Sequence, residues 1–391
     1  MPRPKRVAVV GVGQTTFERT KKETSAEIAG EAAHKALAHA GLTIDDIDCV
    51  LFGAAPDAFD GIHMLGENII DGVGARGKPY MRCTMGGATG MATPIVAYWH
   101  IASGMFKTIL LVCEQKMSPC VPHAQGVFLG NYDEIYHRPI GTNVVRMCSL
   151  EMTRYMHESG ATKEAIAMVA VKNKGNAMDN PYAQLPARLT VEDVLNSEVL
   201  SWPVNRYDIS PTSDGAAAAV LTTEERAREL TDKIVLYDGV GWNMDSIYWE
   251  TRGITSKGYL ERSSKQACDM AGIKNPMKEI DVAEIYDPFT YKECHHAEGL
   301  GLAKPGCGWK LAVEGASFRD GALPINPSGG LLGVGNPIAA AGMMKFNEIA
   351  LQLRGEAGGR QVKKKNLRTA MGQAWGGLFQ FSAVVILRRY D

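Results

Sequence analysis

The same order of predicted elements occurs twice in the chain, and this duplication most restricts the fold. Residues 6–53 show the pattern of a strand, a helix, a glycine and a second strand, and residues 233–286 show it again. The first helix, at 25–40, has apolar residues at helical spacing and a glycine just past its end. Strands and helices that alternate in two similar halves predict a duplicated α/β fold. The alternative is a coincidence between signals that many α/β proteins share.

Each half also contains a glycine-rich turn that is followed by a helix of small residues and then a strand. The turns lie at 83–90 and 329–335, and the helices at 91–103 and 337–354. Small residues let two buried helices approach closely, so we expect both helices at the centre of the fold.

The pattern weakens between the halves, in a region rich in Met, Tyr, His and Asn that is too long for a bare loop. We therefore predict an inserted loop subdomain with helices of its own. The predicted domains are an N-terminal half at 1–118 plus 206–232, the inserted subdomain at 119–205 and a C-terminal half at 233–391.

Composition excludes several classes of function. The 391 residues have a net charge of −1, which gives no reason to expect nucleic acid or an anionic membrane as a partner. No apolar run approaches the roughly 20 residues that span a bilayer, and the N-terminus does not have the pattern of a signal peptide. The eight cysteines are scattered without a CxxC pair. They predict reduced thiols in a cytoplasmic protein, with no metal site.

Cys83 is the first candidate catalytic residue. It lies in the turn Arg82-Cys83-Thr84-Met85-Gly86-Gly87, just ahead of a predicted helix. A thiol near a helix N-terminus feels the positive end of the macrodipole, which favours thiolate. Thiolate is the nucleophile needed to attack a carbonyl or a thioester. On the pattern alone, a structural role for this cysteine stays open.

Five segments, in the correct order, resemble the motifs of the thiolase superfamily. They are the Cys83 turn, the Asp-Gly-Ala-Ala strand at 214–221, Glu-Ile-Tyr-Asp-Pro-Phe-Thr at 284–290, the Asn-Pro-Ser-Gly-Gly to Gly-Asn-Pro loop at 326–337, and Gly-Gln-Ala-Trp-Gly-Gly at 372–377. The third is similar to a motif of the sterol-carrier-protein branch. The resemblance implies two βαβαβαββ-type halves in a layered α/β/α/β/α arrangement, and a homodimer.

The resemblance also implies a catalytic set from which this chain departs. Thiolases use a nucleophilic Cys, matched by Cys83. Their activating His is replaced by Asn336, their second Cys by Ala374, and the His of the His-Asp motif by Tyr286. Asn336 can donate hydrogen bonds to a developing oxyanion but cannot take a proton. Tyr286 can act as an acid, or as a base only if its pKa is lowered well below about 10.

Other residues are expected to shape the site. The glycine loop with Gly376 and Gly377 is expected to help hold the oxyanion, and Trp375, Phe289 and His63 to bind substrate. Candidates for the missing base are histidines of the loops and of the helix after Tyr286, namely His63, His123, His137, His295 and His296.

Three functions follow from the resemblance. The favoured one is a thiolase that cleaves a 3-oxoacyl-CoA through an acyl group on Cys83, with coenzyme A as a substrate and no metal in this chain. Its acyl group would be bulky or aromatic, as in benzoylsuccinyl-CoA. The second is a retro-aldolase that acts on a β-hydroxyacyl-CoA through Tyr286. The third is a non-catalytic subunit that binds acyl-CoA. Similar proteins pair with a small zinc-ribbon/OB-fold subunit, so we expect such a partner.

Overall fold

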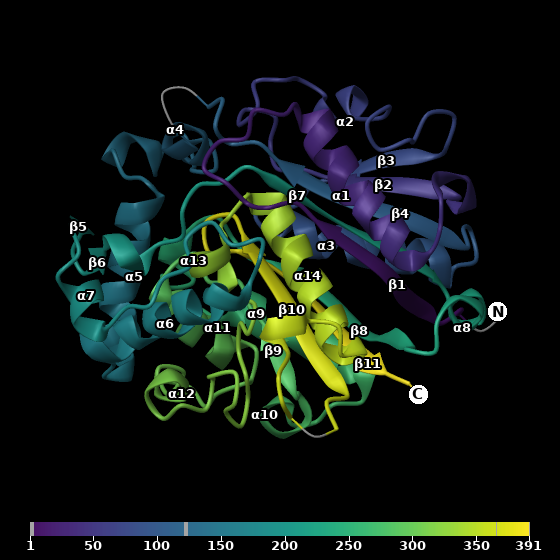
Figure 1. The fold of residues 1–391 in the computed structure, drawn as a ribbon. Coiled ribbons are helices and arrows are strands. Elements are labelled where there is room, and N and C mark those ends of the chain that lie inside the picture. Colours follow the sequence, from purple (N-terminus) through teal and green to yellow (C-terminus); the bar gives the residue numbers. More distant parts are fainter. Residues whose placement is uncertain (1–3, 121–123, 365, 391) are drawn as a thin grey trace.

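The main feature of the computed structural model, which describes residues 4–120, 124–364 and 366–390, is one mixed sheet of nine strands. Its strands are β1 (Val7–Gln14), β2 (Cys49–Gly53), β3 (Tyr80–Cys83), β4 (Thr108–Gln115), β7 (Gly215–Thr223), β8 (Val235–Met244), β9 (Val282–Glu284), β10 (Thr369–Gly376) and β11 (Phe381–Arg389). Across the sheet the order is β3-β2-β4-β7-β1-β8-β11-β10-β9 (Figure 1). The first five come from the N-terminal half and the last four from the C-terminal half. The predicted α/β fold of two halves is confirmed.

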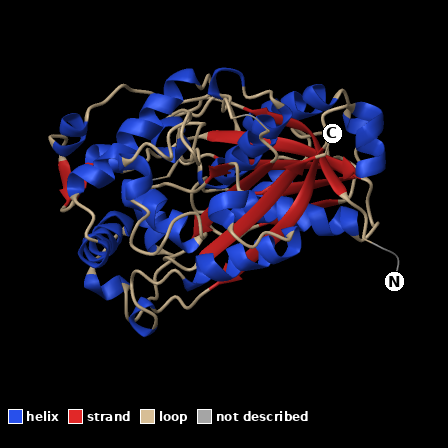
Figure 2. Cartoon of the chain, turned by 90° about the horizontal axis from the view of Figure 1, so that it is seen from below, coloured by secondary structure: helices blue, strands red, loops and turns tan. Residues whose placement is uncertain are grey.

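Helices cover the strands on both faces (Figure 2), and two of them pack on strands of both halves. Helix α1 (Ser25–Ala40) packs on β1, β7 and β4, while α9 (Gly258–Ala271) packs on β8 and β11. Between them lie α3 (Thr89–Ala102) and α14 (Ile338–Arg354), which pack on each other and on strands of both halves. Layers of helix and strand therefore alternate.

The two central helices meet through glycines, as the small residues predicted. A Cβ atom on Gly90 of α3 would lie 2.0 Å from the carbonyl oxygen of Ala339 in α14. No side chain larger than hydrogen fits this contact. The contact brings the start of α3 close to the start of α14, and the turns that precede these two helices carry candidate site residues.

The region between the halves has elements of its own, and none of its described strands joins the main sheet. It contains α4 (Ala124–Leu129), α5 (Val144–Ser159), α6 (Lys163–Asn176), α7 (Val191–Leu195) and the strand pair β5 (Val199–Ser201) and β6 (Val204–Asn205). Helix α6 packs against α11 (Thr290–Gly299) and α13 (Gly330–Val334), next to two motif loops. The domain limits given above stay a prediction.

The segment at 372–377 differs from the expected glycine loop. Residues up to Gly376 belong to strand β10, which pairs with β11, and the turn begins at Gly377. Gly372 is needed for packing, because a Cβ there would lie 2.8 Å from Met91 Cε and 2.9 Å from Ile349 Cδ1. Gly372 therefore allows side chains of the two central helices to pack directly against the backbone of β10.

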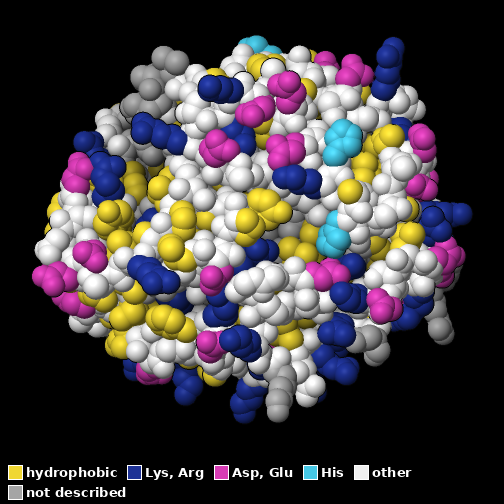
Figure 3. Space-filling model, in the orientation of Figure 1, with side chains coloured by type: hydrophobic (Ala, Val, Ile, Leu, Met, Phe, Trp, Pro, Cys, Tyr) yellow, Lys and Arg dark blue, Asp and Glu magenta, His cyan; other side chains and the backbone are white. Residues whose placement is uncertain are grey.

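The remaining helices are short: α2 (Leu65–Asn68), α8 (Glu224–Leu230), α10 (Pro276–Glu279) and α12 (Lys310–Val313). Among the residues that the structure describes, no helix is long and apolar enough to cross a membrane. Side chains of both charges are mixed over the face seen in Figure 3, in keeping with the net charge of −1.

Candidate active site

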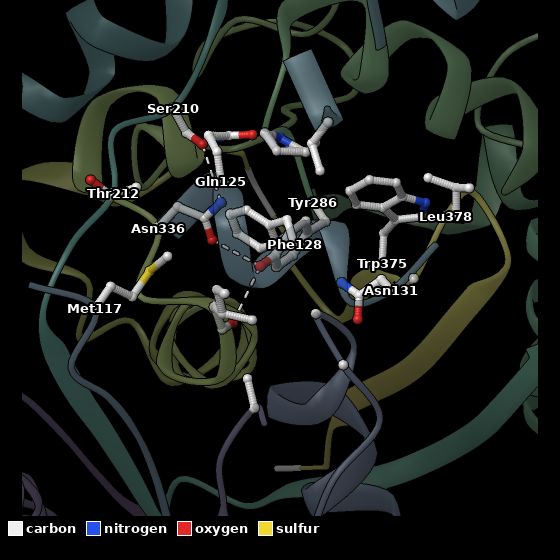
Figure 4. A pocket seen from close by; sticks show the side chains of 18 of the residues that line it. Met117, Gln125, Phe128, Asn131, Ser210, Thr212, Tyr286, Asn336, Trp375 and Leu378 are labelled. Atoms are coloured by element: carbon white, nitrogen blue, oxygen red, sulfur yellow. Dashed lines mark hydrogen bonds between the residues drawn. The ribbon is translucent and has the colours of Figure 1, made fainter. Parts of the chain in front are cut away.

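A largely apolar cavity of about 910 Å³, mouth included, lies where the motif loops of both halves meet. Its wall combines the turn before α3, helix α4, the loops before β7 and after β9, and the turns at α14 and β10. Its aromatic and polar lining residues are Phe59, Gln125, Phe128, Asn131, Tyr132, Ser210, Thr212, Tyr286, Phe289, Asn336 and Trp375, most of which are drawn in Figure 4.

Tyr286 and Asn336 form a hydrogen-bonded pair in this cavity (Figure 4). The Tyr286 hydroxyl donates to Asn336 Oδ1 at 2.9 Å and approaches the carbonyl oxygen of Ile338 at 3.2 Å. The Asn336 side-chain amide donates to Ser210 Oγ at 3.2 Å, and its backbone N–H donates to Ser213 Oγ at 2.9 Å. The amide of Asn336 is therefore held at both ends.

The backbone of Tyr286 is also anchored. Its N–H donates to Gln373 Oε1 at 2.9 Å, and its carbonyl oxygen lies 2.7 Å from His296 Nδ1. Burial, with a smaller effect of the Asp287 charge, raises the pKa of Tyr286 well above its usual value. The phenol therefore stays protonated at neutral pH and acts as a hydrogen-bond donor.

Buried charges lock the loop that carries Tyr286 to the loop that carries Asn336. Asp287 accepts from the backbone N–H of Leu331 at 2.8 Å and pairs with Lys345 at 3.2 Å. Lys345 also pairs with Glu284 at 3.3 Å. Gly330 must be glycine here, since its φ is +58° and a Cβ would lie 2.2 Å from Asp287 Oδ2. This network holds the site rigid without supplying a group to the cavity.

Cys83 lies at the end of edge strand β3, opposite Gly53, and is not among the residues that line the cavity. Burial raises the pKa of its thiol to about 11, which is the opposite of the predicted preference for thiolate. Helix α3 begins only at Thr89, six residues after Cys83 in the chain. The thiol is therefore not placed at the helix N-terminus, and the effect of burial on its pKa dominates. The turn touches the cavity through Gly86 and Gly87 instead. The role of Cys83 as nucleophile stays a prediction.

The structure brings most of the other predicted residues together. Phe289, Trp375, Gly376 and Gly377 line the cavity with Tyr286 and Asn336. His63 does not: it is exposed, in a loop outside the cavity wall.

The described histidines proposed as a base do not line the cavity either. His295 and His296 are fully buried, and this burial lowers the pKa of both well below the usual range, so both are neutral. His137 is buried, stacks on Trp249 at 3.8 Å and pairs with Glu250 at 2.9 Å. His123 lies outside the described residues.

Several contributing residues were not predicted from the sequence. Ser210 and Ser213 orient Asn336, Gln373 anchors Tyr286, and Tyr132 forms part of the cavity wall. The polar turn Ser-Pro-Thr-Ser directly before the core strand β7 was the available signal for the two serines.

Known proteins of one superfamily are similar to this chain over most of its length. A family model described as thiolase C-terminal domain-like matches residues 245–389. An acetyl-CoA acetyltransferase of Methanothermobacter thermautotrophicus is 32% identical over 98% of this chain and 99% of its own length. Human sterol carrier protein 2 is 30% identical over 92% of this chain and 68% of its length.

Two further matches involve proteins whose names indicate a subunit or an assembly. The benzoylsuccinyl-CoA thiolase subunit BbsB of Thauera aromatica is 28% identical over 95% of both chains. The solved structure of the Ltp2-ChsH2(DUF35) aldolase superposes with a TM-score of 0.83 at 25% identity and covers 98% of both chains. By its relatives and its matched domain, this protein is an enzyme of the acyltransferase type. The chain belongs to the thiolase superfamily, in its sterol-carrier-protein-like branch.

Proposed function

We propose that the protein makes or breaks the bond between Cα and Cβ of an acyl-CoA thioester. The observation that carries this proposal is the Tyr286–Asn336 pair in a largely apolar cavity. Asn336 has a second side-chain N–H beside the one that it gives to Ser210, and the Tyr286 O–H can turn from Asn336 Oδ1 to a substrate oxygen that gains negative charge when the bond breaks. Such fixed donors are most effective where water is excluded.

The first form of the reaction is thiolytic acyl transfer, which the similar acyltransferases support. The Cys83 sulfur attacks the ketone carbon of a 3-oxoacyl-CoA, and its proton passes to a base. The bond between Cα and Cβ then breaks, its electron pair moves onto the thioester as an enolate, and Cα is protonated. The acyl group left on sulfur moves to the thiol of a second CoA. Tyr286 and Asn336 hold the oxygens that become negative.

A second candidate is retro-aldol cleavage of a β-hydroxyacyl-CoA, favoured by the presence of Tyr286 rather than Cys83 in the cavity wall. The match to a solved aldolase supports it as well. The Cα–Cβ bond breaks, and the electron pair again passes to the thioester enolate. Tyr286 gives its proton to Cα and takes the proton of the substrate hydroxyl, so it returns to its starting state.

Mass spectrometry of the intact protein distinguishes the two reactions. Wild type and Cys83→Ala are incubated with aromatic and aliphatic 3-oxoacyl-CoAs and with the matching β-hydroxyacyl-CoAs. An acyl adduct that needs Cys83 supports acyl transfer. Cleavage of β-hydroxyacyl-CoAs by both proteins, without an adduct, rejects the thiolase form and supports the aldolase. Binding of acyl-CoA with no adduct and no cleavage by the purified chain, even with a partner subunit added, contradicts both and leaves a non-catalytic subunit.

Aromatic side chains around the cavity support a bulky or aromatic acyl group. Phe59, Phe128, Phe289 and Trp375 all contribute to the wall. Phe59 and Phe128 meet edge to face, with ring centroids 5.2 Å apart. Flat apolar walls of this kind favour a flat apolar group.

We further propose that the chain works in an assembly. One similar protein is named as a subunit, and a second belongs to a structure of two named proteins. These names support a partner subunit, and the resemblance described above implies that it is a small zinc-ribbon/OB-fold protein. The exposed edge of β3, where Met81 is 50% exposed, supports a homodimer formed through this strand. Native mass spectrometry of the chain, alone and with the co-expressed partner, tests both proposals, and a monomer that binds no partner rejects them.

A further inference from the structure

Three successive carbonyl groups at the end of α13, directly before Asn336, accept hydrogen bonds from the region between the halves. The last carbonyl groups of a helix have no partner within the helix, so they need donors from elsewhere. The donors here are Lys174 Nζ to Leu332 at 2.9 Å, the Leu185 N–H to Gly333 at 2.9 Å and the Gln184 N–H to Val334 at 3.0 Å. Residues 174–185 therefore fix the backbone that leads into Asn336.

Gln184 is also connected to Asn336 through its side chain. Its Oε1 accepts a hydrogen bond from the Ser213 hydroxyl at 2.6 Å, and Ser213 Oγ accepts one from the backbone N–H of Asn336 at 2.9 Å. The other acceptor near the hydroxyl, the carbonyl oxygen of Pro211, is 3.5 Å away. Because the Ser213 proton is given to Gln184, the lone pairs of Oγ are left for Asn336.

Gly335 provides the space for this arrangement. Its φ is +124°, which side chains other than glycine rarely adopt, and a Cβ there would lie 2.8 Å from Ser213 Oγ and 3.2 Å from Gln184 Oε1. The turn from α13 into Asn336 is thus packed directly against the Gln184–Ser213 hydrogen bond. Loss of that hydrogen bond should therefore displace Asn336.

We infer that Gln184 is a positioning residue for the reaction, which orients Asn336 through Ser213 and through the carbonyl group of Val334. The inference rests on the proposed function, since both forms of the reaction need the Asn336 amide beside a substrate oxygen. Neither Gln184 nor Ser213 is among the residues that line the cavity. A change at Gln184 should therefore affect kcat more than KM.

Two variants separate the side-chain hydrogen bond from packing at this position. In Gln184→Leu no atom can accept from Ser213, whereas Gln184→Glu keeps an acceptor oxygen and loses only the 3.4 Å contact from Nε2 to the carbonyl oxygen of Thr212. Kinetics use the whole protein, with its partner subunit if one is required, and the 3-oxoacyl-CoA or β-hydroxyacyl-CoA that wild type cleaves fastest. We expect kcat to fall roughly 10–100-fold in Gln184→Leu with KM changed less than about twofold, and Gln184→Glu to keep most of kcat.

Ser213→Ala removes the hydroxyl between Gln184 and Asn336, so it should lower kcat by a similar factor. The double variant Gln184→Leu/Ser213→Ala should be no slower than either single variant, because both changes break one chain of hydrogen bonds. Gln266→Leu is the matched control: Gln266 is exposed, lies outside the cavity wall and accepts from the backbone N–H of Trp242 at 3.0 Å. Losses that multiply in the double variant overturn the inference.

Hydrogen exchange, followed by mass spectrometry of peptides that span residues 331–336, reports on the same segment without a substrate. Exchange there should be roughly tenfold faster in Gln184→Leu than in wild type, and unchanged in Gln184→Glu and Gln266→Leu. If wild type is active but Gln184→Leu keeps both its kcat and its slow exchange, only the inference fails. A fall in kcat that Gln184→Glu shares also overturns it, since packing and not the hydrogen bond would then be the cause. If wild type cleaves no ester, the proposed function fails and the role of Gln184 in it fails too.

Discussion

At the scale of single residues, the chemistry of the site follows from what Tyr286 and Asn336 can and cannot do. Asn336 cannot accept a proton at neutral pH, and its amide is held by Tyr286 and Ser210. Tyr286 remains protonated because it is buried. Together they can stabilise negative charge on oxygen, but in the acyl-transfer form an acceptor for the Cys83 proton has to come from the substrate, from CoA or from another protein.

Replacing Tyr286 by phenylalanine tests this role. We expect kcat to fall by roughly 10²–10³-fold, as for the loss of one donor to an oxyanion, while KM changes less. The melting temperature should fall by a few degrees, because Asn336 Oδ1 loses the hydrogen bond that the buried hydroxyl donates. Steady-state kinetics and thermal unfolding measure both effects, with Tyr390→Phe as a control that removes a remote hydroxyl bonded to Asp238. An unchanged kcat would exclude Tyr286 from the reaction.

The sequence motifs predicted which residues lie at the site, but they did not predict how buried or how hydrogen-bonded the side chains are. Tyr286, Asn336 and Trp375 were predicted because they stand in motifs of the superfamily, and all three line the cavity. The burial of Cys83 could not be read from its motif, since it depends on how far β3 continues before the turn. That the Tyr132 hydroxyl has no hydrogen-bond partner among the described residues depends on long-range packing and has no local sequence signal.

At the scale of elements, glycine carries the packing of the central helices. The strands and helices of the two halves could be predicted from periodicity and end signals; α1, for example, begins after the capping Thr24 and ends at Gly41 with a φ of +67°. The sequence could not show that 372–376 belong to strand β10 and not to a glycine loop. Gly372 is required because Met91, far from it in the sequence, leaves no room for a side chain there. A glycine in the sequence does not by itself show whether it is needed for a turn of the backbone or for close packing against another element.

A pair of glycine substitutions tests the packing argument. Gly90→Ala should destabilise the protein by roughly 1–3 kcal/mol or more, because the new methyl group would overlap the carbonyl oxygen of Ala339. Gly175→Ala lies near the end of α6, where nothing stands within 4 Å of the added carbon, so it should be neutral or stabilising by up to about 1 kcal/mol. Urea unfolding measures both. Equal effects of the two changes would contradict close packing at Gly90.

At the scale of the whole molecule, buried ion pairs tie the region between the halves to the C-terminal half. Lys172 of α6 pairs with Glu293 of α11 at 2.8 Å, and Lys292 of α11 pairs with Glu151 of α5 at 2.6 Å. Lys292 also lies 4.9 Å from the ring centroid of Trp375, which lines the cavity. The position of the cavity wall therefore depends on these ion pairs between the C-terminal half and the region between the halves.

Breaking one of these pairs should cost far more than breaking a surface pair. Lys292→Met leaves Glu151 charged, buried and without its counter-charge, so we expect a loss of about 3–5 kcal/mol in the free energy of unfolding. Lys265→Met removes an exposed partner of Asp269 and should change stability little. Adding Glu151→Gln to Lys292→Met should recover part of the loss. A Lys292→Met variant as stable as wild type would show that the pair does not join the two regions.

The dependence of stability on pH should reflect a cluster of buried carboxyl groups beside the cavity. Burial, together with the nearby Asp214, raises the pKa of Asp60 from 3.8 to about 7, and burial raises that of Glu114 well above its usual value. The folded protein thus keeps protons that the unfolded chain releases between about pH 4 and 7. Over this range the unfolded state binds fewer protons, so stability falls as pH rises.

Asp60→Asn removes one of these titrating groups, so it should make the decrease in stability with rising pH smaller. Below about pH 4 both proteins carry a neutral side chain at this position, whereas above pH 7 only wild type bears the cost of a buried charge. The variant should therefore gain stability relative to wild type as pH rises, by about 4 kcal/mol in total, and the gain should level off above pH 7. Chemical unfolding at pH 4 to 8 measures the difference, with the exposed Asp71→Asn as control. A difference that stays constant with pH would mean that Asp60 ionises as freely in the folded protein as in the unfolded chain, and the cluster would not govern the pH response.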